Sequence, residues 1–135
     1  MPHRELPDDF EDRYHSVWID PPWAELADPA RVGQYYNWTL DELEYAAEMG
    51  LDGVCINEHH QNAYGFMPSP NLMASALARR TKDAAIVVMG ATLPASPPQR
   101  IAEEYGMIDV ISGGRLVAGM PLGSSMDINY CYGVT

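Results

Sequence analysis

The chain has 135 residues, of which 47% are hydrophobic, and this composition is typical of one folded domain rather than of a disordered segment. Its 19 acidic and 8 basic residues give a formal net charge of −11. A surface with this charge repels phosphate backbones and anionic lipids, so we expect neither a nucleic acid nor a membrane as a partner.

No segment of the sequence suggests export or membrane insertion. The longest apolar run, Ala84 to Ala91, is far shorter than the roughly 20 residues of a spanning helix. The acidic N-terminus lacks the apolar stretch of a signal peptide. Cys55 and Cys131 fit no metal-binding or redox spacing. We therefore expect a cytoplasmic protein in which Cys55 is a buried thiol within a strand.

The first part of the chain is predicted to be irregular. Residues 1–38 contain five prolines and form, in this interpretation, an N-terminal loop region. Regular structure is predicted from Thr39, because Thr39 and Glu42 have the spacing of a helix capping box. Gly50 suits a left-handed end for this helix, and residues 51–56 that follow are typical of a short strand.

Two further helix and strand pairs are predicted downstream. Ser69 and Pro70 begin a second helix, and the uninterrupted apolar run 84–90 is typical of a strand buried on both faces. A third helix starts at residues 96–98 and ends at Gly113, before a strand at residues 115–120. The predicted inner faces of the two helices consist of Leu72, Met73, Ala76 and Leu77, and of Ile101, Tyr105, Ile108 and Ile111.

This alternation of helices and strands predicts an α/β fold with parallel strands. An eight-stranded barrel of alternating strands and helices typically needs about 250 residues. Residues 39–135 are therefore predicted to be a partial (β/α)8 barrel, about the first half. The strands at the open edges of such a half-barrel lack partners. We accordingly expect a homo-oligomer, or association with a complementary fragment.

The most informative polar motif is Glu58-His59-His60, at the carboxyl end of the first predicted strand. In α/β folds this edge of the sheet carries the active site. Three interpretations are open: a metal site, a hydrogen-bonded strand end, and general acid/base chemistry by one histidine. Consecutive residues of an extended chain point to opposite sides, which disfavours a shared metal ion. The imidazole reference pKa of about 6.5 suits acid/base chemistry near neutral pH.

Several motifs together resemble the bacterial luciferase-like flavin monooxygenases. They are EHH at residues 58–60, PSPNLMASALARRT at 68–81, LP at 93–94 and RIAEEYGMIDVISGGRLVAG at 100–119. The resemblance extends over roughly residues 39–133. Members of this family are (β/α)8 barrels that hold reduced flavin mononucleotide (FMN), or in some cases a deazaflavin, at the carboxyl face of the barrel. Together with molecular oxygen, the reduced flavin oxygenates a small organic substrate.

The resemblance implies roles for particular residues. His59 corresponds to the acid/base residue next to the flavin, with Glu58 and His60 as its supporting residues in the catalytic group. The implied cofactor-binding residues are Asn57, Met89, Gly90, Ala91, Met120, Leu122 and Gly123. Met89-Gly90 matches a position where the family often has a non-proline cis peptide. Leu122 stands where many members have an arginine that helps to hold the flavin phosphate.

The predicted function is therefore a flavin-dependent monooxygenase acting on a small apolar substrate, with a separate flavin reductase as a possible partner. One alternative is a truncated, non-catalytic half-barrel remnant. Another is a metal-dependent hydrolase that uses Glu58, His59 and His60, although no metal site is predicted.

Overall fold

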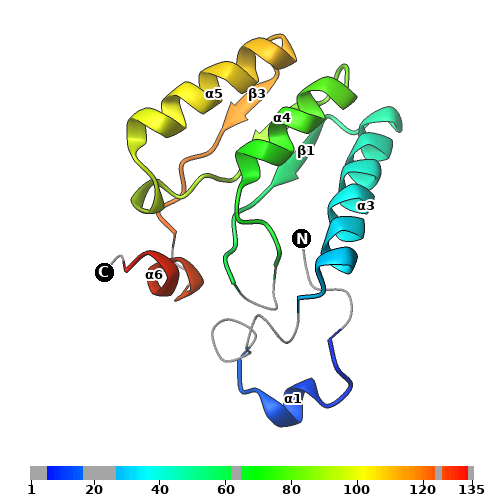
Figure 1. The fold of residues 1–135 in the computed structure, drawn as a ribbon. Coiled ribbons are helices and arrows are strands. Elements are labelled where there is room, and N and C mark those ends of the chain that lie inside the picture. Colours follow the sequence, from blue (N-terminus) through cyan, green and yellow to red (C-terminus); the bar gives the residue numbers. More distant parts are fainter. Residues whose placement is uncertain (1–5, 17–26, 62–64, 124–125, 134–135) are drawn as a thin grey trace.

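The structure is a computed structural model that describes residues 6–16, 27–61, 65–123 and 126–133. A three-stranded parallel sheet with strand order β1-β2-β3 forms its centre, and helices precede, connect and follow the strands (Figure 1). The described elements are α1 (Phe10–Arg13), α3 (Pro29–Glu48), β1 (Gly53–Ile56), α4 (Pro70–Arg80), β2 (Ala85–Val88), a 3-10 turn (Leu93–Ala95), α5 (Pro98–Ser112), β3 (Leu116–Ala118) and α6 (Met126–Tyr132). The predicted α/β fold with parallel strands is thus confirmed.

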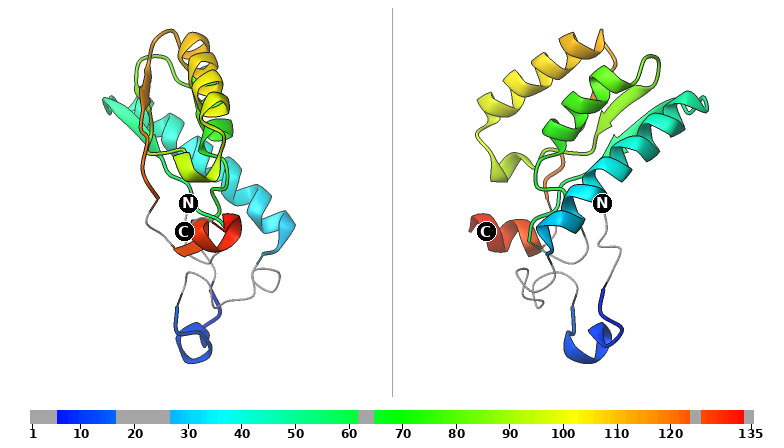
Figure 2. Two further views of the ribbon diagram at one scale, coloured as in Figure 1. Left: turned by 90° about the vertical axis from the view of Figure 1, so that its left-hand side faces the viewer. Right: turned by 45° about the vertical axis from the view of Figure 1, so that its right-hand side comes forward.

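Helices α3, α4 and α5 cover one face of the sheet, as the views in Figure 2 show. Strand side chains alternate between the two faces. Val54, Ile56, Ile86 and Val88 point toward the helices and are at most 3% exposed. They form the core with side chains from α4 and α5: Met73, Ala74, Leu77, Ala78, Ile101, Tyr105 and Ile108.

The opposite face of the sheet is more open, which corrects two predictions. Cys55 is exposed rather than buried, because its position in β1 turns it away from the helices. The apolar run 84–90 is not buried on both faces within the part of the chain that the structure describes. Ile86 and Val88 are fully buried, whereas Val87 is half-buried. In β3, Val117 is 49% exposed.

Helix α3 begins ten residues earlier than the capping box predicted. Pro29 is its first residue, and the Asp28 carboxylate Oδ1 accepts a hydrogen bond of 2.9 Å from the backbone N–H of Ala30. Asp-Pro is a favourable helix start, since the acid caps a free N–H and proline has no N–H to satisfy. Residues 29–38 are therefore helical, not irregular, and Thr39 lies inside the helix.

The helix faces were predicted correctly except at their margins. In α4, Met73 and Leu77 are buried as expected, but Leu72 is 73% exposed, because Ala74 and Ala78 take the inward positions. In α5, the buried stripe ends at Ser112 rather than at Ile111, which is 41% exposed. None of the helices that the structure describes is long and apolar enough to cross a membrane.

Arg115 fastens the amino-terminal end of the sheet. Its guanidinium donates five hydrogen bonds, which reach the carbonyl oxygens of Ala78, Thr81, Ala84 and Ser112 and the Thr81 hydroxyl at 2.8–3.1 Å. Gly113 ends α5 with a φ of 76°, a left-handed conformation that glycine adopts without steric cost. The sequence Ser112-Gly113-Gly114-Arg115 therefore ends α5, as predicted, and its arginine in addition binds carbonyl oxygens at the end of α4.

Candidate active site

The three strands run in the same direction, so the segments that follow them meet at one edge of the sheet. Backbone pairing continues slightly beyond the strands: Met89 N–H donates to the Ile56 carbonyl and Gly119 N–H donates to the Val88 carbonyl, each at 2.8 Å. The polar residues after β1 are thereby held next to the loops after β2 and β3. This is the edge where the sequence placed the site.

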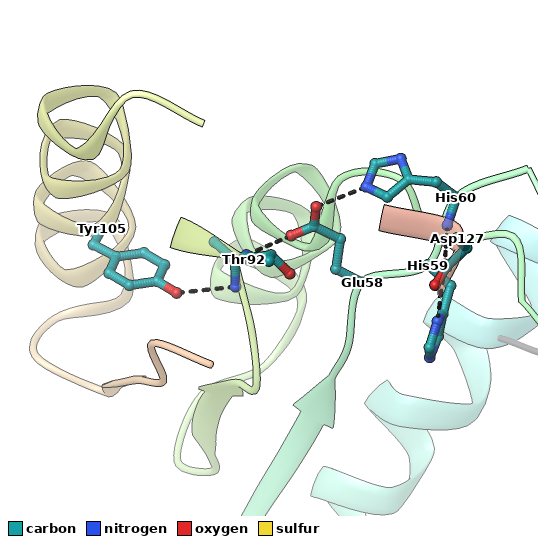
Figure 3. A network of polar contacts seen from close by, with 7 residues as sticks. Glu58, His59, His60, Thr92, Tyr105 and Asp127 are labelled. Carbon is teal, nitrogen blue, oxygen red and sulfur yellow. Dashed lines mark hydrogen bonds and ion pairs between the residues drawn. The ribbon is translucent and has the colours of Figure 1, made fainter. Parts of the chain in front are cut away.

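Glu58 joins the end of β1 to the loop after β2 (Figure 3). Its Oε2 accepts a hydrogen bond of 2.7 Å from the backbone N–H of Thr92, and its Oε1 lies 2.7 Å from Nε2 of His60. The Glu58 and His60 side chains are 8% and 7% exposed. The His60 and Tyr132 rings also meet in a T-shaped contact, with centroids 4.9 Å apart at 83°. His60 is therefore enclosed by Glu58 and α6.

His59 contacts a different carboxylate. Its Nδ1 lies 3.3 Å from Oδ2 of Asp127, and the same oxygen accepts a hydrogen bond of 2.8 Å from the backbone N–H of His60. Asp127 lies in α6 and its side chain is fully buried, whereas the His59 side chain is 13% exposed. The backbone N–H of His59 donates to the Met67 carbonyl at 2.9 Å, which fixes the chain at this point. Each imidazole thus has its own carboxylate partner (Figure 3).

Sequence reasoning missed both Asp127 and the helix that carries it. Asp127 is 67 residues from His60 in the chain, so no local spacing links the two. The available signal was a single acid in an otherwise uncharged stretch, residues 116–135. Such an isolated acid beside apolar residues is a candidate for a buried, hydrogen-bonded role.

Tyr105 connects the ends of β2 and β3. Its hydroxyl donates to the Gly119 carbonyl at 2.6 Å and accepts from the Ala91 N–H at 3.3 Å. Burial, and to a lesser extent the Glu58 charge, raises the pKa of Tyr105, although the Ala91 N–H opposes this rise. The hydroxyl therefore stays protonated and ties the two loops together. Tyr105 was predicted only as an inward-facing apolar residue.

The remaining residues of the predicted flavin site fall into two groups. Met89 and Met120, which follow β2 and β3, are each 60% exposed, and Leu122 is 81% exposed. Gly90 and Ala91 are buried, whereas Asn57 and Gly123 are half-buried. The peptide between Met89 and Gly90 is cis, as the resemblance led us to expect. Among these residues, the exposed side chains are thus apolar. The buried residues, Gly90 and Ala91, pack inside the loop after β2.

No cluster of three or more histidine, cysteine, aspartate or glutamate side chains in the described ranges has the geometry of a metal site.

Comparison with known proteins decides the family. The sequence profile of the luciferase-like monooxygenases matches residues 22–135. The chain belongs to the luciferase-like monooxygenase family. Among its relatives, 3,6-diketocamphane 1,6-monooxygenase of Pseudomonas putida is 28% identical over 101 residues, which are 75% of this chain and 27% of that protein. The oxygenase component of the flavin-dependent trigonelline monooxygenase of Acinetobacter baylyi is 28% identical over 73% of this chain and 28% of its own length.

A solved structure of the luciferase-like family has the same fold. The oxygenating constituent of 3,6-diketocamphane monooxygenase from Pseudomonas putida, in complex with FMN, superimposes with a TM-score of 0.71 at 27% identity. The match covers 89% of this chain and 31% of that one. The chain therefore corresponds to part of a luciferase-like barrel, and it spans under a third of the length of these relatives.

Proposed function

We propose that this chain supplies the acid/base end of the active site of a flavin-dependent monooxygenase. The reaction would use reduced FMN and molecular oxygen to oxygenate a small apolar organic substrate. The observation that carries the proposal is the placement of His59, with its carboxylate partner, at the carboxyl edge of the sheet, the edge that also carries the exposed Met89 and Met120.

The exposed side chains fit the ring of a flavin better than its phosphate. Met89 and Met120 offer apolar contact for a flat aromatic ring, and His59 offers a nitrogen for proton exchange. Leu122 brings no charge to the position where the resemblance places an arginine. The phosphate contact is therefore assigned to the remainder of the barrel. Bound reduced flavin would supply the electrons that activate oxygen, while these residues orient the ring and hold or move the proton.

Completion of the barrel is the second part of the proposal. Cys55 and Val117 face away from the helices and are exposed, and in a closed barrel such positions point to the interior. We assign that cover to the strands that make up the rest of the luciferase-like barrel, either in the same protein or in a complementary fragment. A separate reductase would deliver reduced flavin, in keeping with a relative that is named as an oxygenase component.

Flavin binding tests the proposal directly. Oxidised FMN is titrated with the purified protein, and saturable quenching of flavin fluorescence is expected, with a deazaflavin titrated in parallel. Met89→Ala and Met120→Ala should each weaken binding by roughly tenfold, since each removes about 1–2 kcal/mol of apolar contact. Met107→Ala is the matched control, because Met107 is 64% exposed on α5, away from the site.

Equal affinities for the three methionine variants would contradict the assignment of the ring to Met89 and Met120. Binding of the deazaflavin together with no binding of FMN would contradict FMN as the cofactor. If no flavin of either kind changes its fluorescence, the alternative of a half-barrel that binds no cofactor by itself is favoured. The exposed inner face of the sheet, with Cys55 and Val117, is the observation that supports this alternative.

A further inference from the structure

The two adjacent histidines meet their carboxylates through different ring nitrogens. His59 uses Nδ1 toward Asp127, at 3.3 Å, and His60 uses Nε2 toward Glu58, at 2.7 Å. All four side chains are at most 13% exposed. In a neutral imidazole only one nitrogen carries hydrogen, so the position of the carboxylate determines which nitrogen that is.

The backbone shows that Asp127 accepts hydrogen bonds at this point. Its Oδ2 is bound by the backbone N–H of His60 at 2.8 Å, and an N–H can only donate. The same oxygen faces Nδ1 of His59. With Asp127 as a carboxylate, which has no hydrogen to give, the hydrogen between Asp127 and His59 lies on Nδ1. The other nitrogen of that ring, Nε2, is then the basic one.

The same reasoning gives the opposite result for His60. Oε2 of Glu58 accepts from the Thr92 N–H, and Oε1 faces Nε2 of His60. With Glu58 as a carboxylate, which accepts hydrogen bonds only, the hydrogen lies on Nε2 of His60. This ring is also closed in by Tyr132, which leaves His59 as the more open imidazole of the pair.

We propose that Asp127 and Glu58 are positioning residues that hold the neutral rings of His59 and His60 in opposite tautomers. His59 carries its hydrogen on Nδ1, and its Nε2 is the atom that takes up and returns the proton of the reaction. The tautomer assignment stands on the contacts and on both acids being carboxylates, and only the reaction role of Nε2 rests on the proposed monooxygenase function. Asp127 thus sets which atom of His59 acts, although it lies on a different element.

Nitrogen-15 NMR of the protein with labelled histidine tests the assignment at mildly alkaline pH, where imidazoles are neutral. Protonated and unprotonated ring nitrogens have well-separated chemical shifts. The four histidines are assigned by replacing them one at a time. We expect hydrogen on Nδ1 of His59 and on Nε2 of His60. Hydrogen on Nε2 of His59 in the unmodified protein would overturn the proposal without any further variant.

Two substitutions separate positioning from general stability. Asp127→Ala should let His59 shift toward the Nε2-protonated form and leave His60 unchanged. Asp127→Asn should retain the Nδ1 hydrogen, because the His60 N–H holds the amide oxygen, not the NH2 group, at the position that faces Nδ1. Glu58→Gln should leave the His59 tautomer unchanged. If both Asp127 variants give the same His59 spectrum as the unmodified protein, Asp127 does not set the tautomer. Opposite tautomers in a protein that binds no flavin would uphold the positioning and refute only the role in oxygenation.

Discussion

Replacing Arg115 by alanine is expected to cause a large loss of folding stability. The side chain donates five hydrogen bonds, and the residues that accept them, Ala78, Thr81, Ala84 and Ser112, are buried or nearly so. A hydrogen bond to a charged group contributes about 1.5–3 kcal/mol. Even if water replaced three of the five bonds, the free energy of unfolding would fall by about 3–6 kcal/mol. This is a large part of the roughly 5–15 kcal/mol that holds a typical domain together.

Urea unfolding followed by circular dichroism measures this loss. Arg115→Lys should recover part of it, because an ammonium has three donors but lacks the planar fork that reaches several carbonyls at once. Arg100→Ala is the control: Arg100 pairs with Glu104 on the surface of α5 and is largely exposed, so its removal should have little effect. Similar unfolding midpoints for the Arg115 and Arg100 alanine variants would refute the reasoning.

Three other predictions concern packing and ionisation. Tyr105→Phe removes the bond to Gly119 and should cost about 1–2 kcal/mol at neutral pH. Because the folded state raises the pKa of Tyr105, the advantage of tyrosine over phenylalanine should be complete below about pH 10 and shrink above it in pH-dependent urea titrations; a constant difference would contradict this. Leu77→Ala, in the core, should cost about 2–5 kcal/mol in the same assay, whereas Leu72→Ala should stay within about 0.5 kcal/mol. Gly33→Ala, on an open face of α3, should raise the melting temperature by stabilising the helix by about 0.5–1 kcal/mol.

Much of the fold could be predicted because local signals and packing agree. Pro70, Gly113 and the apolar stretches fixed the order of α4, β2, α5 and β3. The errors arose where two local signals competed. Thr39 and Glu42 satisfy the capping pattern, yet Asp28 and Pro29 supply an earlier helix start. The residues between Pro29 and Thr39 then belong to the same helix. Periodicity alone also could not tell whether Leu72 or Ala74 faces inward. Which side of the helix is buried depends on the elements that pack against it.

The candidate site was only half accessible to sequence reasoning. His59, Glu58 and His60 could be located because they follow a recognisable strand. Which carboxylate each imidazole would meet depended on tertiary packing. The family resemblance implied Glu58 and His60 as the supporting residues of His59, whereas the contacts pair Glu58 with His60 and bring Asp127 to His59. Contacts across more than sixty residues carry no period or spacing that one sequence reveals.

The distance along the chain between the histidines and Asp127 has a consequence for synthesis. Ribosomes add about 5–20 residues per second, so Asp127 is made several seconds after His60. During that interval the strand end can form, but its imidazoles lack the carboxylate that orients His59. Arg115, whose hydrogen bonds stabilise the amino-terminal end of the sheet, is synthesised before Asp127. The nascent chain can therefore stabilise its scaffold before His59 meets the carboxylate of Asp127.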